Sequence, residues 1–108
     1  MKTVNKTNSF GEQLRNLRGN LGMTLKFVSN EIGIDTSLLA KIERNERQPT
    51  RQNIKQIANF FKVDEKDLQR DFLSDIIAYK ILEEQADISI LKVAEEKVKY
   101  LKTVQNGK

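Results

Sequence analysis

The sequence contains no cysteine and no histidine. These two absences exclude disulfides, thiol nucleophiles, zinc fingers and every catalytic arrangement that depends on an imidazole. The pattern brings no basic or nucleophilic group to the carboxylates of Glu83 and Glu84, so we expect that the protein is not an enzyme. We also expect that it binds no metal, cofactor or small-molecule ligand. No apolar run approaches the roughly 20 residues that span a bilayer, and residues 1–13 lack the apolar core of a signal peptide. We therefore expect a cytoplasmic protein that does not bind a membrane.

The charge is unevenly spread along the 108 residues, which carry a net charge of +4. Residues 1–63 contain 11 lysines and arginines against 5 acidic residues, whereas residues 64–108 contain 8 against 10. A basic N-terminal part indicates binding to a polyanion such as nucleic acid. Two solvated surfaces that differ by chance remain the alternative.

Apolar residues recur at helical spacing throughout, and no segment alternates as a strand does. The pattern predicts an all-α protein with helices over about residues 10–21, 65–84 and 88–104, after a flexible arm over residues 1–9. Between the first and the fifth helix lie a second helix that Gly33 ends, a third that Asp35 caps, and a fourth that Pro49 and Thr50 open. Ser9 with Glu12, Thr24 and Asp35 are suited to cap the first three helices. Gly22 and Gly33 follow the last apolar positions of the first and second helices, as helix-ending glycines do.

The second and third helices, joined by a tight turn at Gly33, form a helix-turn-helix pattern. We expect their packing to depend on apolar residues, with Phe27 beside them: Leu25, Val28, Ile32, Ile34, Leu39 and Ile42. The opposite face of the third helix carries Thr36, Ser37, Ala40 and Lys41, which suit the approach to base edges in a major groove. An ordinary pair of helices with a solvated face is the alternative.

The segments FGEQLRNLR, LGMTLKFVSNEIGID and SLLAKIERNERQPT carry a resemblance to a known family. Over residues 10–68 the chain resembles the Cro/C1-type (XRE) helix-turn-helix regulators, with the motif at about residues 24–44. The resemblance implies a λ-repressor-like five-helix DNA-binding domain that reads specific double-stranded DNA as a homodimer.

The resemblance also implies roles for individual residues. Base-reading roles fall on Thr36, Ser37, Leu38 and Lys41. Phosphate-binding roles fall on Thr24, Lys26, Arg44, Arg47, Thr50 and Arg51. It implies a semi-buried ion pair between Arg18 and Glu43. Two positions depart from the family pattern, because Leu25 replaces a glutamine that follows the helix cap and Asn45 replaces a loop glycine.

Residues 69–108 form a C-terminal helical extension with apolar stripes, which must be buried against each other or against a partner. We expect dimerisation through Phe72, Ile76, Leu91, Ala94, Val98 and Leu101, with completion of the monomer core as the alternative. The short plan resembles the controller proteins of restriction-modification systems, which implies autoregulation. An antitoxin or a protein-interaction adaptor remains open.

Overall fold

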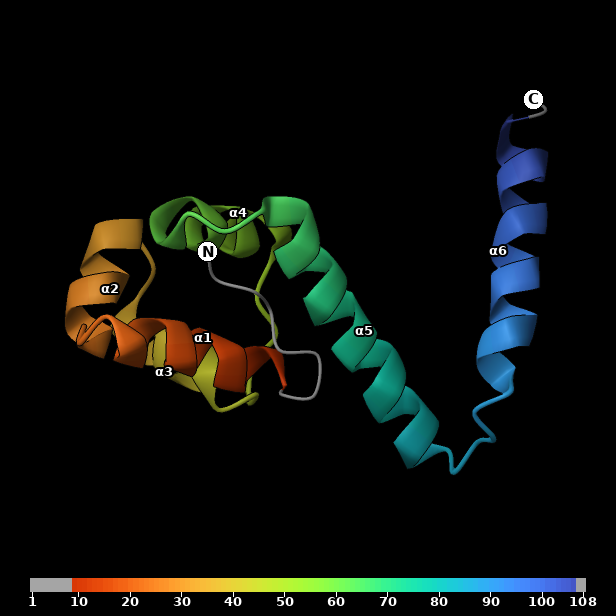
Figure 1. Ribbon diagram of the computed structural model, residues 1–108, viewed down its shortest axis with the longest axis horizontal. Helices are drawn as coiled ribbons and strands as arrows, with labels where there is room; N and C mark the ends of the chain where they lie inside the picture. The colour runs from red at the N-terminus through yellow and green to blue at the C-terminus, as the bar shows by residue number, and fades with distance from the viewer. Residues whose placement is uncertain (1–8, 107–108) are drawn as a thin grey trace. The chain divides into compact units, whose positions relative to one another are not determined.

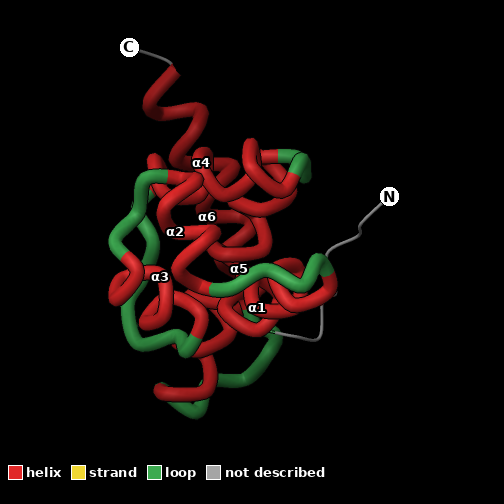
Figure 2. The backbone as a smooth tube through the Cα atoms, turned by 90° about the vertical axis from the view of Figure 1, so that its left-hand side faces the viewer, coloured by secondary structure: helices red, strands yellow, loops and turns green. Residues whose placement is uncertain are grey.

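The computed structural model describes residues 9–106, and all of the regular structure in that range is helical (Figure 1). Short loops join the helices (Figure 2). The predicted all-α class is confirmed, as a five-helix helix-turn-helix fold followed by a C-terminal helix. The helices are α1 (Phe10–Asn20), α2 (Leu25–Ile32), α3 (Thr36–Glu43), α4 (Arg51–Phe61), α5 (Glu65–Glu83) and α6 (Ile90–Asn106).

The helix starts follow from local sequence. Ser9 and Glu12 form a capping box at the start of α1, and Thr50 and Asn53 form another at the start of α4. The Thr24 hydroxyl accepts a hydrogen bond from the backbone N–H three residues further on. Each cap satisfies backbone donors that have no partner within the helix, and the predicted caps at Ser9, Thr24 and Asp35 are confirmed.

Four chain reversals in residues 9–63 use a left-handed backbone conformation, at Gly22, Gly33, Asn45 and Lys62. Gly22 follows α1 with φ +67°, and Gly33 ends α2 with φ +75°. Glycine enters this region without the steric cost that a Cβ imposes. Asn45 has φ +61° in the loop after α3, so the chain reversal predicted at this asparagine is confirmed.

The core lies among α1 to α4 and the first turns of α5, and it contains the apolar residues expected to fix the helix-turn-helix. Val28, Leu39 and Ile42 are almost completely buried. The prediction for Phe27 was wrong, because its side chain is 48% exposed. Leu25, Val28 and Ile32 define the inward face of α2 at spacings of three and four. Phe27 directly precedes Val28 and is therefore rotated by about 100° around the helix axis, away from that face.

The N-terminal end of α1 is fastened to α5. The rings of Phe10 and Phe72 meet edge to face, with their centroids 5.4 Å apart. The Phe10 backbone N–H donates to Asp75 Oδ2 at 2.6 Å, and Gln13 Nε2 donates to Asp71 Oδ2 at 2.6 Å. Phe72, a predicted dimerisation residue, therefore packs within its own chain.

The chain divides into two compact units between Ile76 and Ile77, inside α5 and later than the predicted domain boundary after residue 68. In the second unit α6 starts two residues later than the predicted helix over 88–104 and ends later. No residue of α6 is buried. Among the described residues, no helix is both long and apolar enough to span a membrane.

Candidate nucleic-acid interface

The turn between α2 and α3 is rigidly held. The backbone N–H groups of Gly33 and Ile34 both donate to the Ser29 carbonyl, at 2.9 and 3.0 Å. Ile34 is buried between the helices. Asp35 Oδ2 then accepts hydrogen bonds from the first turn of α3 and fixes where this helix begins. The orientation of α3 is thus determined by backbone contacts and by core side chains together.

The predicted base-reading residues of α3 differ in how far they are buried and in what they contact. Ser37 is exposed, and Lys41 is half-buried with its ammonium on a long stem. Thr36 is half-buried, and its hydroxyl lies 2.6 Å from the Ser29 hydroxyl. Leu38 is half-buried and packs against the core. Leu38 therefore helps to seat α3 on the domain, whereas Ser37 and Lys41 extend from the face.

The N-terminal ends of α2 and α4 lack acidic residues in their first turns. This differs from α1 and α5, whose first turns carry Glu12 and both Glu65 and Asp67. Acidic side chains normally stabilise the positive end of the helix dipole. Without them, the free backbone N–H groups and the positive dipole favour a phosphate. The predicted phosphate-binding residues at these two ends are exposed: Thr24, Lys26, Thr50 and Arg51.

The loop after α3 contains an ion pair that sequence reasoning missed. Arg44 Nε and Nη2 lie 2.9 and 3.1 Å from the two carboxylate oxygens of Glu46. Hydrogen bonding to Arg44 lowers the pKa of Glu46, and the positive charge of Lys41 acts in the same direction. Arg44 thus already holds a carboxylate in the geometry in which arginine holds a phosphate. Arg47 is exposed in the same loop.

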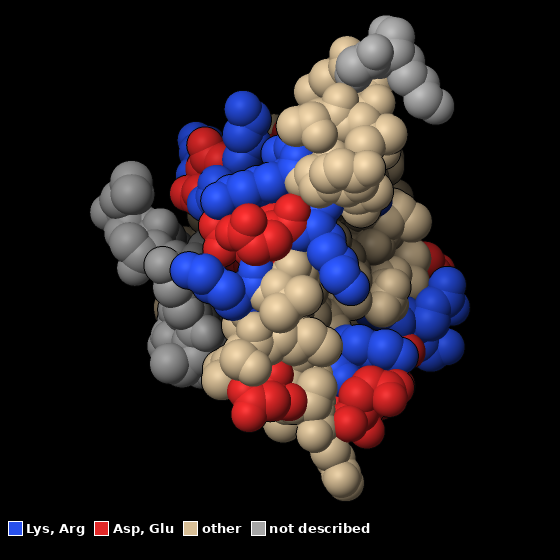
Figure 3. Space-filling view, turned by 90° about the vertical axis from the view of Figure 1, so that its right-hand side faces the viewer, with Lys and Arg blue, Asp and Glu red and all other residues tan. Residues whose placement is uncertain are grey.

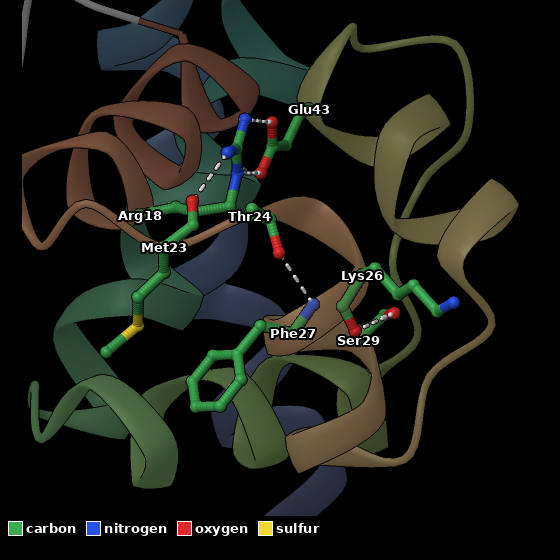
Figure 4. A network of polar contacts seen from close by, with 7 residues as sticks. All are labelled: Arg18, Met23, Thr24, Lys26, Phe27, Ser29 and Glu43. Carbon is green, nitrogen blue, oxygen red and sulfur yellow. Dashed lines mark hydrogen bonds and ion pairs between the residues drawn. The ribbon is translucent and has the colours of Figure 1, made fainter.

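Arg18 and Glu43 form an ion pair that joins the end of α1 to the end of α3 (Figure 4). Two parallel contacts connect them, Nε to Oε2 at 2.8 Å and Nη2 to Oε1 at 2.9 Å. Arg18 Nη1 also donates to the Met23 carbonyl at 2.9 Å, just before α2. Hydrogen bonding to Glu43 raises the pKa of Arg18. One guanidinium therefore connects three segments that position the recognition helix.

The start of α1 is pressed closely against the end of α3. A Cβ added to Gly11 would lie 2.5 Å from the Glu43 carbonyl oxygen and 2.7 Å from that of Ile42. The Asn45 side chain accepts from the Gly11 N–H at 3.1 Å and donates to Ser9 Oγ at 3.0 Å. Asparagine in place of the loop glycine therefore links α1 to the loop, a role that a glycine does not supply.

Three residues that contribute to the structure around α3 were not predicted as functional: Gly11, Ser29 and Glu46. Gly11 and Ser29 act through contacts with residues that are distant along the chain, so periodicity gives no signal for them. Glu46 lies only two residues from Arg44 in an irregular loop, where no regular spacing predicts which side chains meet. Among residues 9–106, no group of three or more acidic side chains is arranged to hold a metal ion.

The fold and this surface define a class: a helical domain in which α3 presents a polar face with Ser37 exposed, beside two helix ends that favour phosphate. The family model described as a helix-turn-helix domain matches residues 11–70, which is more than half of the chain. The protein belongs to this helix-turn-helix family. No curated protein sequence matches it. The fold and the family together indicate a DNA-binding regulator.

Proposed function

We propose that this protein is a transcriptional regulator that binds specific double-stranded DNA as a homodimer at an inverted-repeat operator. The observation that carries the proposal is the absence of acidic residues from the first turns of α2 and α4, together with the exposed Ser37 and the half-buried Thr36 and Lys41 on α3. The helix ends suit phosphates, which position a protein on the duplex, and α3 suits base edges, which supply specificity. The basic charge of residues 1–63 supports the same conclusion.

The second unit supports the homodimer. Side chains that normally form cores are about half exposed or more there, among them Ile77, Leu82, Val98 and Leu101. Apolar residues of α5 beyond its buried start also point in nearly every direction around the helix, an arrangement typical of a buried helix. A second copy offers the same apolar surface.

Charge does not oppose this association, because residues 77–108 carry 6 lysines against 5 acidic residues. On α6 the Lys99 ammonium pairs with Glu95 at 3.4 Å and with Glu96 at 3.9 Å. Figure 3 shows one face of the protein, on which Lys and Arg side chains lie interspersed with Asp and Glu side chains. The near-neutral charge of residues 77–108 is compatible with burial against a second copy.

Two-fold symmetry then determines the form of the operator. Two recognition helices related by a two-fold axis read half-sites separated by about 34 Å or a multiple of it, so the site is an inverted repeat. We extend the proposal to an autoregulatory controller, as in restriction-modification systems, on the strength of the resemblance of the C-terminal segment. The exposed face of α6 also supports a second candidate, an antitoxin or adaptor whose C-terminal unit binds another protein.

Selection of bound sequences from random duplex DNA tests the proposal directly. We expect an inverted repeat that is also present upstream of the protein's own gene. If a dimer neutralises ~6–8 phosphates, log K falls against log salt concentration with a slope of roughly −5 to −7. Failure to enrich any sequence, together with binding that does not depend on salt, refutes DNA reading and favours the adaptor.

Two substitutions separate the roles of the surface. Lys41→Ala removes a donor from the reading face of α3, so we expect a cost of ~1–3 kcal/mol and relaxed base preference at one position. Arg47→Ala removes an exposed loop charge, so binding weakens about equally for all sequences and the salt slope falls by about one. A changed preferred sequence with Arg47→Ala, but not with Lys41→Ala, contradicts this orientation of α3.

A further inference from the structure

Three oxygen atoms form a chain of close contacts that runs from α2 to the first residue of α3. Ser29 is buried on α2, with only 1% of its surface exposed. Its Oγ lies 3.0 Å from the Lys26 carbonyl oxygen, a hydrogen bond that Figure 4 shows along α2. On its other side the same Oγ lies 2.6 Å from Oγ1 of Thr36, the first residue of α3. This chain of contacts therefore connects the interior of α2 to the first residue of the reading face.

Counting protons determines the direction of these hydrogen bonds. Each hydroxyl has one proton to donate, and the carbonyl has none. Both contacts are hydrogen bonds only if Ser29 donates to Lys26 and Thr36 donates to Ser29. If Ser29 donated to Thr36 instead, no proton would remain for the contact between Ser29 Oγ and the Lys26 carbonyl oxygen, and that contact would not be a hydrogen bond. The Thr36 hydroxyl is then committed as a donor inside the protein, and only its lone pairs remain for a ligand.

We propose that Thr36 reads the operator as a hydrogen-bond acceptor and that the buried Ser29 imposes this role. The inference rests on the proposed DNA-binding function. Residues at the N-terminal end of a recognition helix contact base edges. In the major groove adenine and cytosine offer an amino group as donor, whereas guanine and thymine offer carbonyl oxygens. An acceptor at Thr36 therefore selects adenine or cytosine at the base it faces.

Ser37 offers a matched control on the next residue of the same helix. Its hydroxyl is exposed and has no hydrogen-bond partner among the described residues. A free hydroxyl rotates to donate or to accept, so it discriminates less between bases. Both hydroxyls belong to the first turn of α3, but only that of Thr36 contacts Ser29.

The test uses the duplex selected from random DNA, synthesised with each of the four bases at the position whose preference Thr36→Val abolishes. We expect the wild type to bind the adenine or cytosine duplex roughly fivefold more tightly than the guanine and thymine duplexes, the value of about one net hydrogen bond. Ser29→Ala releases the Thr36 proton, so this ratio falls towards one. Ser37→Ala leaves the ratio unchanged. A wild-type preference for guanine or thymine there, or an unchanged ratio in Ser29→Ala, overturns the proposal.

A measurement on the free protein tests the same relay, meaning the hydrogen bonds from Thr36 to Ser29 and from Ser29 to the Lys26 carbonyl, without DNA. This measurement uses the wild type and so does not depend on whether Ser29→Ala folds. Neutron diffraction of deuterated wild-type crystals locates the hydroxyl deuterons. We expect the Thr36 deuteron to point at Ser29 Oγ and the Ser29 deuteron to point at the Lys26 carbonyl. A Thr36 deuteron directed to solvent refutes the relay. Absence of binding to every duplex instead refutes the proposed function and leaves this result intact.

Discussion

Replacing Arg18 by methionine tests how the recognition helix is held on the domain. Methionine keeps most of the apolar stem of the side chain but removes all three hydrogen bonds that the guanidinium donates. Two of these bonds go to Glu43, whose side chain is only 5% exposed, while that of Arg18 is 17% exposed. The third goes to the Met23 carbonyl. The variant therefore leaves a buried carboxylate without its cation.

Removing one partner of a buried pair costs ~3–5 kcal/mol, because the remaining charge is desolvated and unpaired. For a domain of this size, 1 kcal/mol shifts the melting temperature by roughly 4–8 °C. We therefore expect Arg18→Met to lower the melting temperature by at least ~10 °C. The double change with Glu43→Leu replaces both charges by apolar groups, and it should recover much of the loss.

The Arg44–Glu46 pair provides the control, because it has the same two-contact geometry but side chains that are 56% and 54% exposed. An exposed pair contributes between about 0 and 1 kcal/mol and weakens with salt. Urea denaturation of each single and double variant gives the coupling energy of both pairs. Additive effects of the Arg18 and Glu43 changes, or a coupling no larger than that of the exposed pair, refute the reasoning.

Three further outcomes follow from particular contacts. Gly11→Ala forces a Cβ onto backbone oxygens and should destabilise the fold by several kcal/mol, whereas Gly19→Ala, with nothing within 4 Å, should stabilise it by up to ~1 kcal/mol in thermal denaturation. Burial raises the pKa of Asp71, so the folded state binds the proton of this carboxyl group more tightly than the unfolded state does. The stability that the protonated carboxyl group contributes is lost as pH rises through the raised pKa. The stability of Asp71→Asn relative to wild type should therefore increase from about pH 4 upwards, and a constant difference contradicts this. Val98→Asp with Leu101→Asp should reduce dimerisation and weaken binding to a full operator far more than to a half-site. A wild type that sediments as a monomer at micromolar concentration argues against that interface.

Helix starts and turns could be predicted because they depend on a few neighbouring residues. Ser9 and Glu12 are three residues apart and form their capping box within one turn. Gly33 and Asn45 adopt the left-handed conformation, which glycine and asparagine tolerate better than most residues do. The apolar spacing of α2 and α3 identified the core face, although it did not place Phe27 correctly. The family pattern supplied the roles on α3, which no local rule supplies.

Other features were decided only when distant segments met. The contacts of Gly11 with the end of α3 and of Phe10 with Phe72 join residues more than thirty positions apart. The bond between Ser29 and Thr36 spans the turn and depends on the angle between α2 and α3. The sequence by itself determined where α1 to α5 begin, to within a residue or two, and which face of the helix-turn-helix is apolar, because those preferences are local. Tertiary structure alone decided which polar groups are left free for a ligand, because a hydroxyl's partner depends on how the helices pack.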